Sequence, residues 1–311
     1  MGGSCVDLRV ELGGLKLKNP LMLASGILGT SPGLLRRVEE AGAAAVVTKT
    51  VTLAPRSGYL NPVIVELEQG FLNAMGLPNP GAEYFASKVL AKAARELRVP
   101  VILSMSPADP EEAYRIALLG AKAGARGIEI NLSCPHVSGL GASLSRSLEL
   151  VEDIVKASRR GAREIPIFVK LSAEQDYVAV ARTALESGAS GIVAINTIRA
   201  VAIDVYAKAP ILSNVYGGLS GPAIRPIAVR VVWDLYEELG PVPIVGVGGV
   251  YSWKNAIELM LAGASAVGIG TAIAVKGLAV FTEILSGIKR YLTEEGFTTV
   301  REIIGLAHEN V

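Results

Sequence analysis

The hydrophobic residues of this chain form short apolar runs that alternate with longer amphipathic stretches. The runs are rich in Val, Ile, Leu and Ala and are apolar almost throughout, which is typical of parallel strands buried on both faces. They occupy residues 21–24, 45–47, 100–103, 127–130, 166–170, 192–195, 242–246 and 266–269. Stretches between them predict helices, among them 31–41, 109–123, 145–159 and 252–261. Three of these open with a residue suited to cap a helix: Ser31, Asp109 and Ser145.

A second pattern, a helix end followed by Gly-Ala and then an apolar run, occurs four times. Its glycines are Gly42, Gly124, Gly188 and Gly263. Glycine adopts the left-handed conformation that ends a helix, so the chain can turn directly into a strand. Each interval between these glycines has room for two βα units of roughly 30–40 residues. The chain is therefore predicted to be an α/β protein whose residues 1–311 form one (β/α)8 barrel domain. The length and the number of repeats disfavour the alternative, a doubly wound open sheet.

Two insertions interrupt the alternation. Residues 51–80 are long and rich in glycine and proline, and residues 197–221 separate the end of a strand from the next helix. We expect both to be loops at the C-terminal ends of strands, where a barrel places its active site.

Composition excludes several classes of protein. Half of the 311 residues are hydrophobic and 19% are charged, so a compact fold is expected rather than disorder. The formal charge of +1 argues against nucleic-acid binding. The apolar stretch 266–275 is far shorter than the roughly 18 residues that span a membrane. Two cysteines, Cys5 and Cys134, form neither a disulfide framework nor a metal set, and no secretion signal opens the chain, so we expect a soluble cytoplasmic protein without a metal site.

Polar residues follow nearly every predicted strand, where a barrel gathers its functional groups. Lys49 and Lys170 end two otherwise apolar strands and would face the same mouth, which suggests an anionic ligand. The alternative is that both lysines extend to solvent at the rim. The other strand-end residues are Ser25, Gly26, Ser104, Asn131, Cys134, Asn196, Thr197, Gly248, Gly249, Gly270 and Thr271.

The last two predicted strands are followed by Gly248-Gly249 and Gly270-Thr271. These pairs fit the phosphate site that barrels build from their last two βα loops, although glycine there also serves plain tight turns. The glycine-rich loops typical of dinucleotide or nucleoside triphosphate sites are absent. A phosphate-bearing cofactor such as FMN is therefore favoured. A flavin-free barrel that binds a phosphorylated metabolite remains the alternative.

Cys134 lies in the segment Asn131-Leu-Ser-Cys-Pro-His136, directly after a strand. This position suits acid–base or nucleophilic chemistry. The plainer interpretation is a small buried hydrophobic residue, as most free cysteines are.

Eight ordered motifs resemble those of the class 1 dihydroorotate dehydrogenases, from Pro20 to about Gly270. They are Ala24-Ser25-Gly26, Thr48-Lys49-Thr50, residues 72–81, Asn131 to Pro135, Val169 to Ser172, Ile195-Asn196-Thr197, Gly217 to Pro222 and Gly246 to Val250. The forms at 196–197 and 217–222 are closer to the class 1B catalytic subunit than to the class 1A homodimer. The resemblance implies an FMN-containing barrel that oxidises (S)-dihydroorotate to orotate in pyrimidine (UMP) biosynthesis.

The resemblance also implies a role for each matching residue. Cys134 would be the general base that removes the proton from carbon 5, while a hydride passes from carbon 6 to FMN. The substrate would be held by Lys49, Asn73, Met75, Gly76, Leu77, Asn131, Asn196 and Thr197. FMN would be bound by Ser25, Lys49, Thr50, Asn131, Lys170, Ile195, Gly221, Gly248, Gly249, Gly270 and Thr271, with Lys170 stabilising the reduced anion.

The class 1B form further implies partners. A catalytic homodimer would join two electron-transfer subunits in a heterotetramer, and these subunits would carry FAD and a 2Fe–2S cluster that pass electrons to NAD. Two positions depart from the family, because His136 and Ser104 stand where asparagine is usual. The Ser-Cys-Pro-His form also resembles dihydropyrimidine dehydrogenase, which reduces uracil or thymine. That substrate class stays open as an alternative, although the cluster-binding cysteines of that enzyme are absent from this chain.

Overall fold

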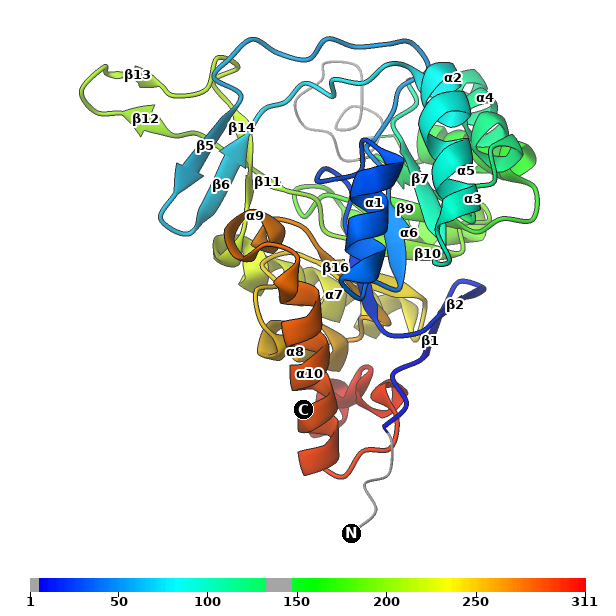
Figure 1. Ribbon diagram of the computed structural model, residues 1–311, viewed down its shortest axis with the longest axis vertical. Coiled ribbons are helices and arrows are strands. Elements are labelled where there is room, and N and C mark those ends of the chain that lie inside the picture. The colour runs from blue at the N-terminus through cyan, green and yellow to red at the C-terminus, as the bar shows by residue number, and fades with distance from the viewer. Residues whose placement is uncertain (1–5, 133–146) are drawn as a thin grey trace.

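A computed structural model of the protein describes residues 6–132 and 147–311 (Figure 1). At its centre eight parallel strands close into a barrel, in the order β10-β15-β16-β3-β4-β7-β8-β9. The strands are β3 (Leu21–Leu23), β4 (Ala45–Val47), β7 (Val101–Met105), β8 (Gly127–Asn131), β9 (Ile167–Leu171), β10 (Gly191–Ala194), β15 (Ile244–Val247) and β16 (Ala266–Ile269). The bounds of each strand differ by at most two residues from those of an apolar run in the sequence. The predicted (β/α)8 barrel is confirmed.

The helices form a ring outside the barrel (Figure 1). They are α1 (Pro32–Glu40), α2 (Ala82–Phe85), a π-helical turn (Ala86–Leu90), α3 (Ala91–Glu96), α4 (Pro110–Lys122), α5 (Leu148–Ala162), α6 (Tyr177–Glu186), α7 (Arg225–Leu239), α8 (Trp253–Leu261), α9 (Ala272–Lys276) and α10 (Ala279–Glu294). Short 3-10 turns add Pro222–Ile224, Val300–Ile303 and Leu306–Asn310. No helix in the described part of the chain is both long enough and apolar enough to cross a membrane.

Local signals place the starts of the helices. Ser31 caps α1, its Oγ accepting a hydrogen bond from the Leu34 N–H at 3.3 Å, and Asp109 caps α4 in the same way. Each cap is followed by a proline, whose missing N–H costs nothing in the first turn. The expected cap at Ser145 is wrong: α5 starts at Leu148, and the Ser147 side chain caps it, while Ser145 lies outside the described residues.

The four Gly-Ala joints turn helix into strand as predicted. Their glycines have φ angles between 90° and 121°, a region that other residues rarely adopt. Strands β7, β8 and β9 are buried at every position, because helices cover the outside and side chains fill the inside.

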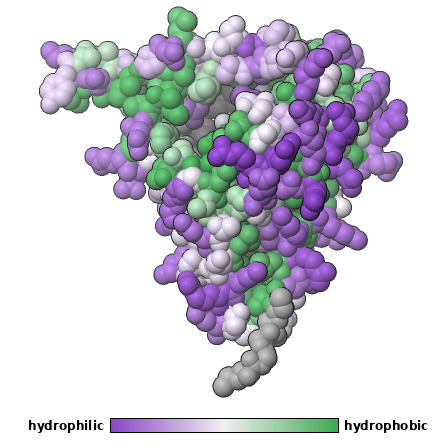
Figure 2. Space-filling view, in the orientation of Figure 1, coloured by the Kyte–Doolittle hydropathy of each residue, from purple (hydrophilic) through white to green (hydrophobic). Residues whose placement is uncertain are grey.

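The two insertions are not plain loops, contrary to expectation. They supply β5 (Ile64–Leu67), β6 (Gly70–Asn73), β11 (Ile198–Ala200) and β14 (Gly217–Ser220), which pair as a four-stranded sheet in the order β11-β14-β6-β5. A small arm, β12 (Ile203–Asp204) with β13 (Ala209–Pro210), projects from this sheet (Figure 1). Apolar residues gather around the base of the arm (Figure 2). The sheet escaped prediction because its central pair, β6 with β14, joins two insertions that lie far apart in the sequence.

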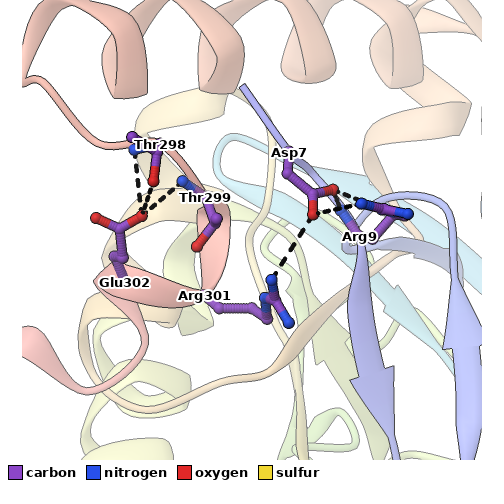
Figure 3. Close-up of polar contacts among 6 residues, drawn as sticks. All are labelled: Asp7, Arg9, Thr298, Thr299, Arg301 and Glu302. Atoms are coloured by element: carbon purple, nitrogen blue, oxygen red, sulfur yellow. Dashed lines mark hydrogen bonds and ion pairs between the residues drawn. The ribbon is translucent and has the colours of Figure 1, made fainter. Parts of the chain in front are cut away.

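The opposite end of the barrel carries a hairpin of β1 (Val10–Leu12) and β2 (Leu15–Leu17), whose alternate residues are buried. A polar cluster joins this region to the C-terminal segment (Figure 3). There the Asp7 carboxylate accepts hydrogen bonds from the Arg9 backbone and guanidinium at 2.8–3.0 Å, and it lies 3.7 Å from Arg301. The hydrogen bonds from Arg9, with smaller attraction from both arginines, hold the pKa of Asp7 at about 2. The adjacent Glu302 accepts hydrogen bonds from Thr298 and Thr299, which lower its pKa.

Candidate active site

A cavity of about 390 Å³ opens at the C-terminal ends of the barrel strands, beneath the sheet formed by the insertions. Every predicted substrate or cofactor residue in the described part of the chain lines it. These are Ser25, Lys49, Thr50, Asn73, Met75, Gly76, Leu77, Asn131, Lys170, Ile195, Asn196, Thr197, Gly221, Gly248, Gly249, Gly270 and Thr271. The carboxyl ends of parallel strands meet at one rim, so residues far apart in sequence converge there. The functional roles of these residues stay predictions.

Both predicted lysines face this cavity. Lys170 lies near the C-terminal end of β9 and is only 4% exposed. Its Nζ donates a hydrogen bond at 3.0 Å to the Oγ of Ser25, which follows β3. Lys49 follows β4 and is half-buried. Neither side chain simply extends to solvent, so the cavity presents two cationic groups to whatever it holds.

Amide side chains form a second group on the cavity wall. The Asn196 Nδ2 donates to the Asn131 Oδ1 at 3.3 Å, and the Asn196 Oδ1 accepts from the Thr197 backbone N–H at 2.8 Å. Asn73, at the end of β6, donates to the Gly218 carbonyl at 3.2 Å. The bond between Asn196 and Asn131, and the bonds of Asn196 and Asn73 to the backbone, orient these amides, which can both donate to and accept from a planar polar ligand.

Glycines line the part of the cavity beside β15. Gly248 has φ 143° and Gly249 has φ 67°, both in the region that favours glycine. A Cβ on Gly248 would lie 2.7 Å from the Ala228 Cβ, and one on Gly249 would lie 2.6 Å from the Arg225 Cβ. Side chains are thus excluded here, and backbone forms the cavity wall. Gly270 and Thr271 lead into α9, a helix of only five residues.

Ser104 does not project into the cavity as an asparagine near a flavin would. Its side chain is fully buried on β7, and its Oγ donates to the Glu129 Oε1 at 2.8 Å. The same Oγ lies 2.8 Å from the Thr50 Oγ1. The prediction missed Glu129, which stands inside an otherwise apolar run; a carboxylate at that position was the available signal.

Phe71 and Tyr251 are among the other residues of the cavity wall that escaped prediction. Phe71 lies two residues before Asn73 on β6 and so shares its face, a relation that appears only once the segment is known to be a strand. Tyr251 lines the same wall, and burial, with a smaller effect from the charge of Glu66, raises its pKa. Cys134 and His136 lie outside the described residues, and the chain leading to them is described as far as the buried Leu132.

Comparisons with known proteins agree with this geometry. The family model of dihydroorotate dehydrogenase matches residues 7–292. The catalytic subunit of dihydroorotate dehydrogenase B (NAD(+)) of Pyrococcus abyssi is 48% identical over 303 residues, which cover 96% of this chain and 99% of the relative. The subunits of the same name from Pyrococcus furiosus (46% identical, 98% of this chain, 100% of the relative) and Methanocaldococcus jannaschii (44%, 99% and 100%) are also similar. The resemblance predicted from the motifs is confirmed: the chain belongs to the dihydroorotate dehydrogenase family, whose members are oxidoreductases.

Proposed function

We propose that this protein is the catalytic subunit of an NAD-linked dihydroorotate dehydrogenase, which uses FMN to oxidise (S)-dihydroorotate to orotate in pyrimidine biosynthesis. One observation carries the proposal: the predicted substrate and FMN residues that the structure describes line a single cavity. This convergence supports the class 1 chemistry that the ordered motifs imply.

The cavity suits FMN in size and in chemistry. Its volume of about 390 Å³ lies within the range of small-molecule and cofactor sites, about 300–1,000 Å³. Gly248 and Gly249 line the cavity without side chains, so their backbone N–H groups could contact a phosphate, and Gly221, Gly270 and Thr271 would complete that region. Ser25, Thr50, Asn131, Ile195 and the two lysines would hold the ring system. Lys170, fixed by Ser25, would place positive charge beside it.

The remaining polar groups suit the substrate. The carboxylate of dihydroorotate would pair with Lys49, and the amide edges of its ring would meet Asn73, Asn131, Asn196 and Thr197. Backbone N–H groups of Met75, Gly76 and Leu77 would contribute further donors. Because amide side chains carry both donors and acceptors, this set matches a ring whose edges do the same.

The reaction breaks two C–H bonds of the substrate and forms the double bond between its carbons 5 and 6. Cys134 would take the proton from carbon 5, since a thiol near cations ionises more readily than a free one. The chemistry that FMN supplies when bound is acceptance of the hydride from carbon 6. Lys49 and the amides would hold the substrate so that carbon 5 faces the base and carbon 6 faces the flavin.

The electrons would then pass to NAD through a second subunit that carries FAD and a 2Fe–2S cluster. The relatives' names, catalytic subunits of an NAD(+)-linked enzyme, support the link to NAD and the second subunit, while FAD and the cluster rest on the class 1B resemblance. We further propose a heterotetramer built on a homodimer of this chain, acting in the cytoplasm.

The decisive experiment is anaerobic mixing of the purified protein with dihydroorotate or dihydrouracil, followed by flavin absorbance. The proposal expects a yellow protein with stoichiometric FMN that dihydroorotate bleaches rapidly. Colourless protein that does not take up added FMN would overturn the flavin assignment in favour of a flavin-free barrel. Rapid bleaching by dihydrouracil alone would assign the chain to dihydropyrimidine chemistry instead.

A further inference from the structure

Beneath the large cavity, inside the barrel, lies a buried carboxylate for which the proposed reaction has no use. Glu129 is 2% exposed and lies two residues before Asn131 on β8, so both side chains point to the barrel interior. It lines a small second cavity of about 10 Å³ to which all eight strands contribute. Besides Glu129 and Lys170, the other described residues of that lining are apolar, among them Met22, Val47, Ile102 and Val245.

A chain of hydroxyl groups links this carboxylate to the flavin cavity. Ser104 donates its only hydroxyl proton to the Glu129 Oε1, so in the 2.8 Å contact between Ser104 and Thr50 the proton must come from Thr50. The Thr50 Oγ1 is left with lone pairs and no proton, and Thr50 lines the large cavity. The carboxylate therefore fixes Thr50 as an acceptor toward that cavity.

Lys170 is the second charged group in this region. It lines both cavities, and Asn131 on β8 pairs in register with it on β9. Glu129 lies two residues before the position on β8 that faces Lys170 on the neighbouring strand β9. With a rise of about 3.3 Å per residue and a spacing of about 4.8 Å between strands, their Cα atoms are roughly 8 Å apart. Glu129 thus places a negative charge one layer below the cation that faces the cofactor.

A carboxylate in this position is not explained by stability. Burying a charge among apolar side chains is costly, and a hydrophobic residue of similar size is often neutral or better in such a place. An electrostatic role accounts for it. Resting on the proposed function, we propose that Glu129 is a positioning residue that, with Ser104 and Thr50, lowers the reduction potential of the bound flavin.

The direction follows from the charge. Electron uptake adds negative charge above Glu129, and a negative charge below opposes it, partly balancing the pull of Lys170. Ser104 contributes because its hydroxyl donates the hydrogen bond that stabilises the Glu129 carboxylate. This role accounts for serine at a position where asparagine is usual in the family: the hydroxyl holds the Glu129 carboxylate.

The test is anaerobic redox titration of the FMN-loaded full-length chain. Glu129→Gln should raise the potential by at least a tenfold change in the two-electron equilibrium, about 30 mV. Glu129→Met, which also removes the charge, should raise it similarly without loss of thermal stability. Ser104→Ala should shift it in the same direction by a smaller factor. Ser106→Ala should leave it unchanged, because Ser106 is an equally buried serine whose Oγ has no hydrogen-bond partner among the described residues.

The outcomes separate this inference from the function on which it rests. Wild-type potentials in both Glu129 variants would overturn the tuning role while leaving dihydroorotate oxidation intact. Loss of FMN from both would show a structural role and overturn it equally. An equal shift in Ser104→Ala and Ser106→Ala would refute the link through Ser104. A wild-type chain that binds no FMN would instead refute the proposed function itself.

Discussion

Replacing Gly248 with alanine tests whether the glycines beside β15 are required by the backbone as well as by a ligand. Gly248 follows β15 with φ 143°, and a Cβ there would lie 2.7 Å from the Ala228 Cβ on α7. Carbon atoms pack best at about 3.5–4.0 Å, so the added methyl overlaps its neighbour by roughly 0.8 Å or more. Ala228 is fully buried in the core and cannot move aside without shifting α7.

Two costs contribute. Holding alanine in a glycine-only conformation costs about 1–3 kcal/mol, and overpacking a dense interior costs about 1–3 kcal/mol. Gly248→Ala should therefore reduce the free energy of unfolding by about 2–6 kcal/mol, a large share of the ~5–15 kcal/mol typical of folded domains. FMN affinity should also fall, because the methyl group displaces the backbone that would face the phosphate.

Equilibrium unfolding in urea measures the first effect, and quenching of flavin fluorescence on binding measures the second. Gly240→Ala is a matched control: Gly240 also has positive φ, 74°, but no atom of the described residues lies within 4 Å of its added Cβ. It should lose only the conformational part, about 1–3 kcal/mol, because φ 74° with ψ −163° is a conformation that is essentially restricted to glycine. Combining Gly248→Ala with Ala228→Gly should recover about 1–3 kcal/mol in a double-mutant cycle. Equal losses in the two glycine variants, or no coupling with position 228, would refute the clash.

Three further predictions concern other parts of the molecule. Cys134→Ala should retain FMN yet lose most turnover at neutral pH, and Cys134→Ser should recover activity only at high pH; normal rates in the alanine variant would rule out the base assignment. Asp7→Asn should lower Tm, because the pKa of Asp7 is depressed from the usual 3.8 to about 2 by its hydrogen bonds with Arg9. That stabilisation is fully present above about pH 4 and lost as pH falls through about 2, so the Tm difference from wild type should shrink over that range, and a constant difference would contradict the assignment. Asp109→Ala should cost about 0.5–2 kcal/mol in urea unfolding, since the carboxylate caps α4 by accepting from the Glu112 N–H at 2.8 Å; no loss would show that the cap is unimportant.

Local sequence pattern determined the barrel because each of its elements carries its own signal. Strands buried on both faces are apolar at nearly every position, and glycines such as Gly42 and Gly263 mark where a helix must end in the left-handed conformation. The site followed from the fold, since the C-terminal ends of parallel strands share one rim. Lys49 and Lys170, which follow or end two different strands, therefore line one cavity, as their positions in the sequence predict.

Only the tertiary structure decided which distant segments pair. Asn73 lies beside Gly218 because two insertions form one sheet, a register that no local pattern encodes. Glu129 looked like an interruption in an apolar run, and Ser104 like a departure from a motif, until packing brought them within 2.8 Å of each other. Hydrophobic periodicity reports which face of an element is buried, whereas the partner of a buried polar group depends on neighbouring strands, whose side chains meet only when the barrel closes.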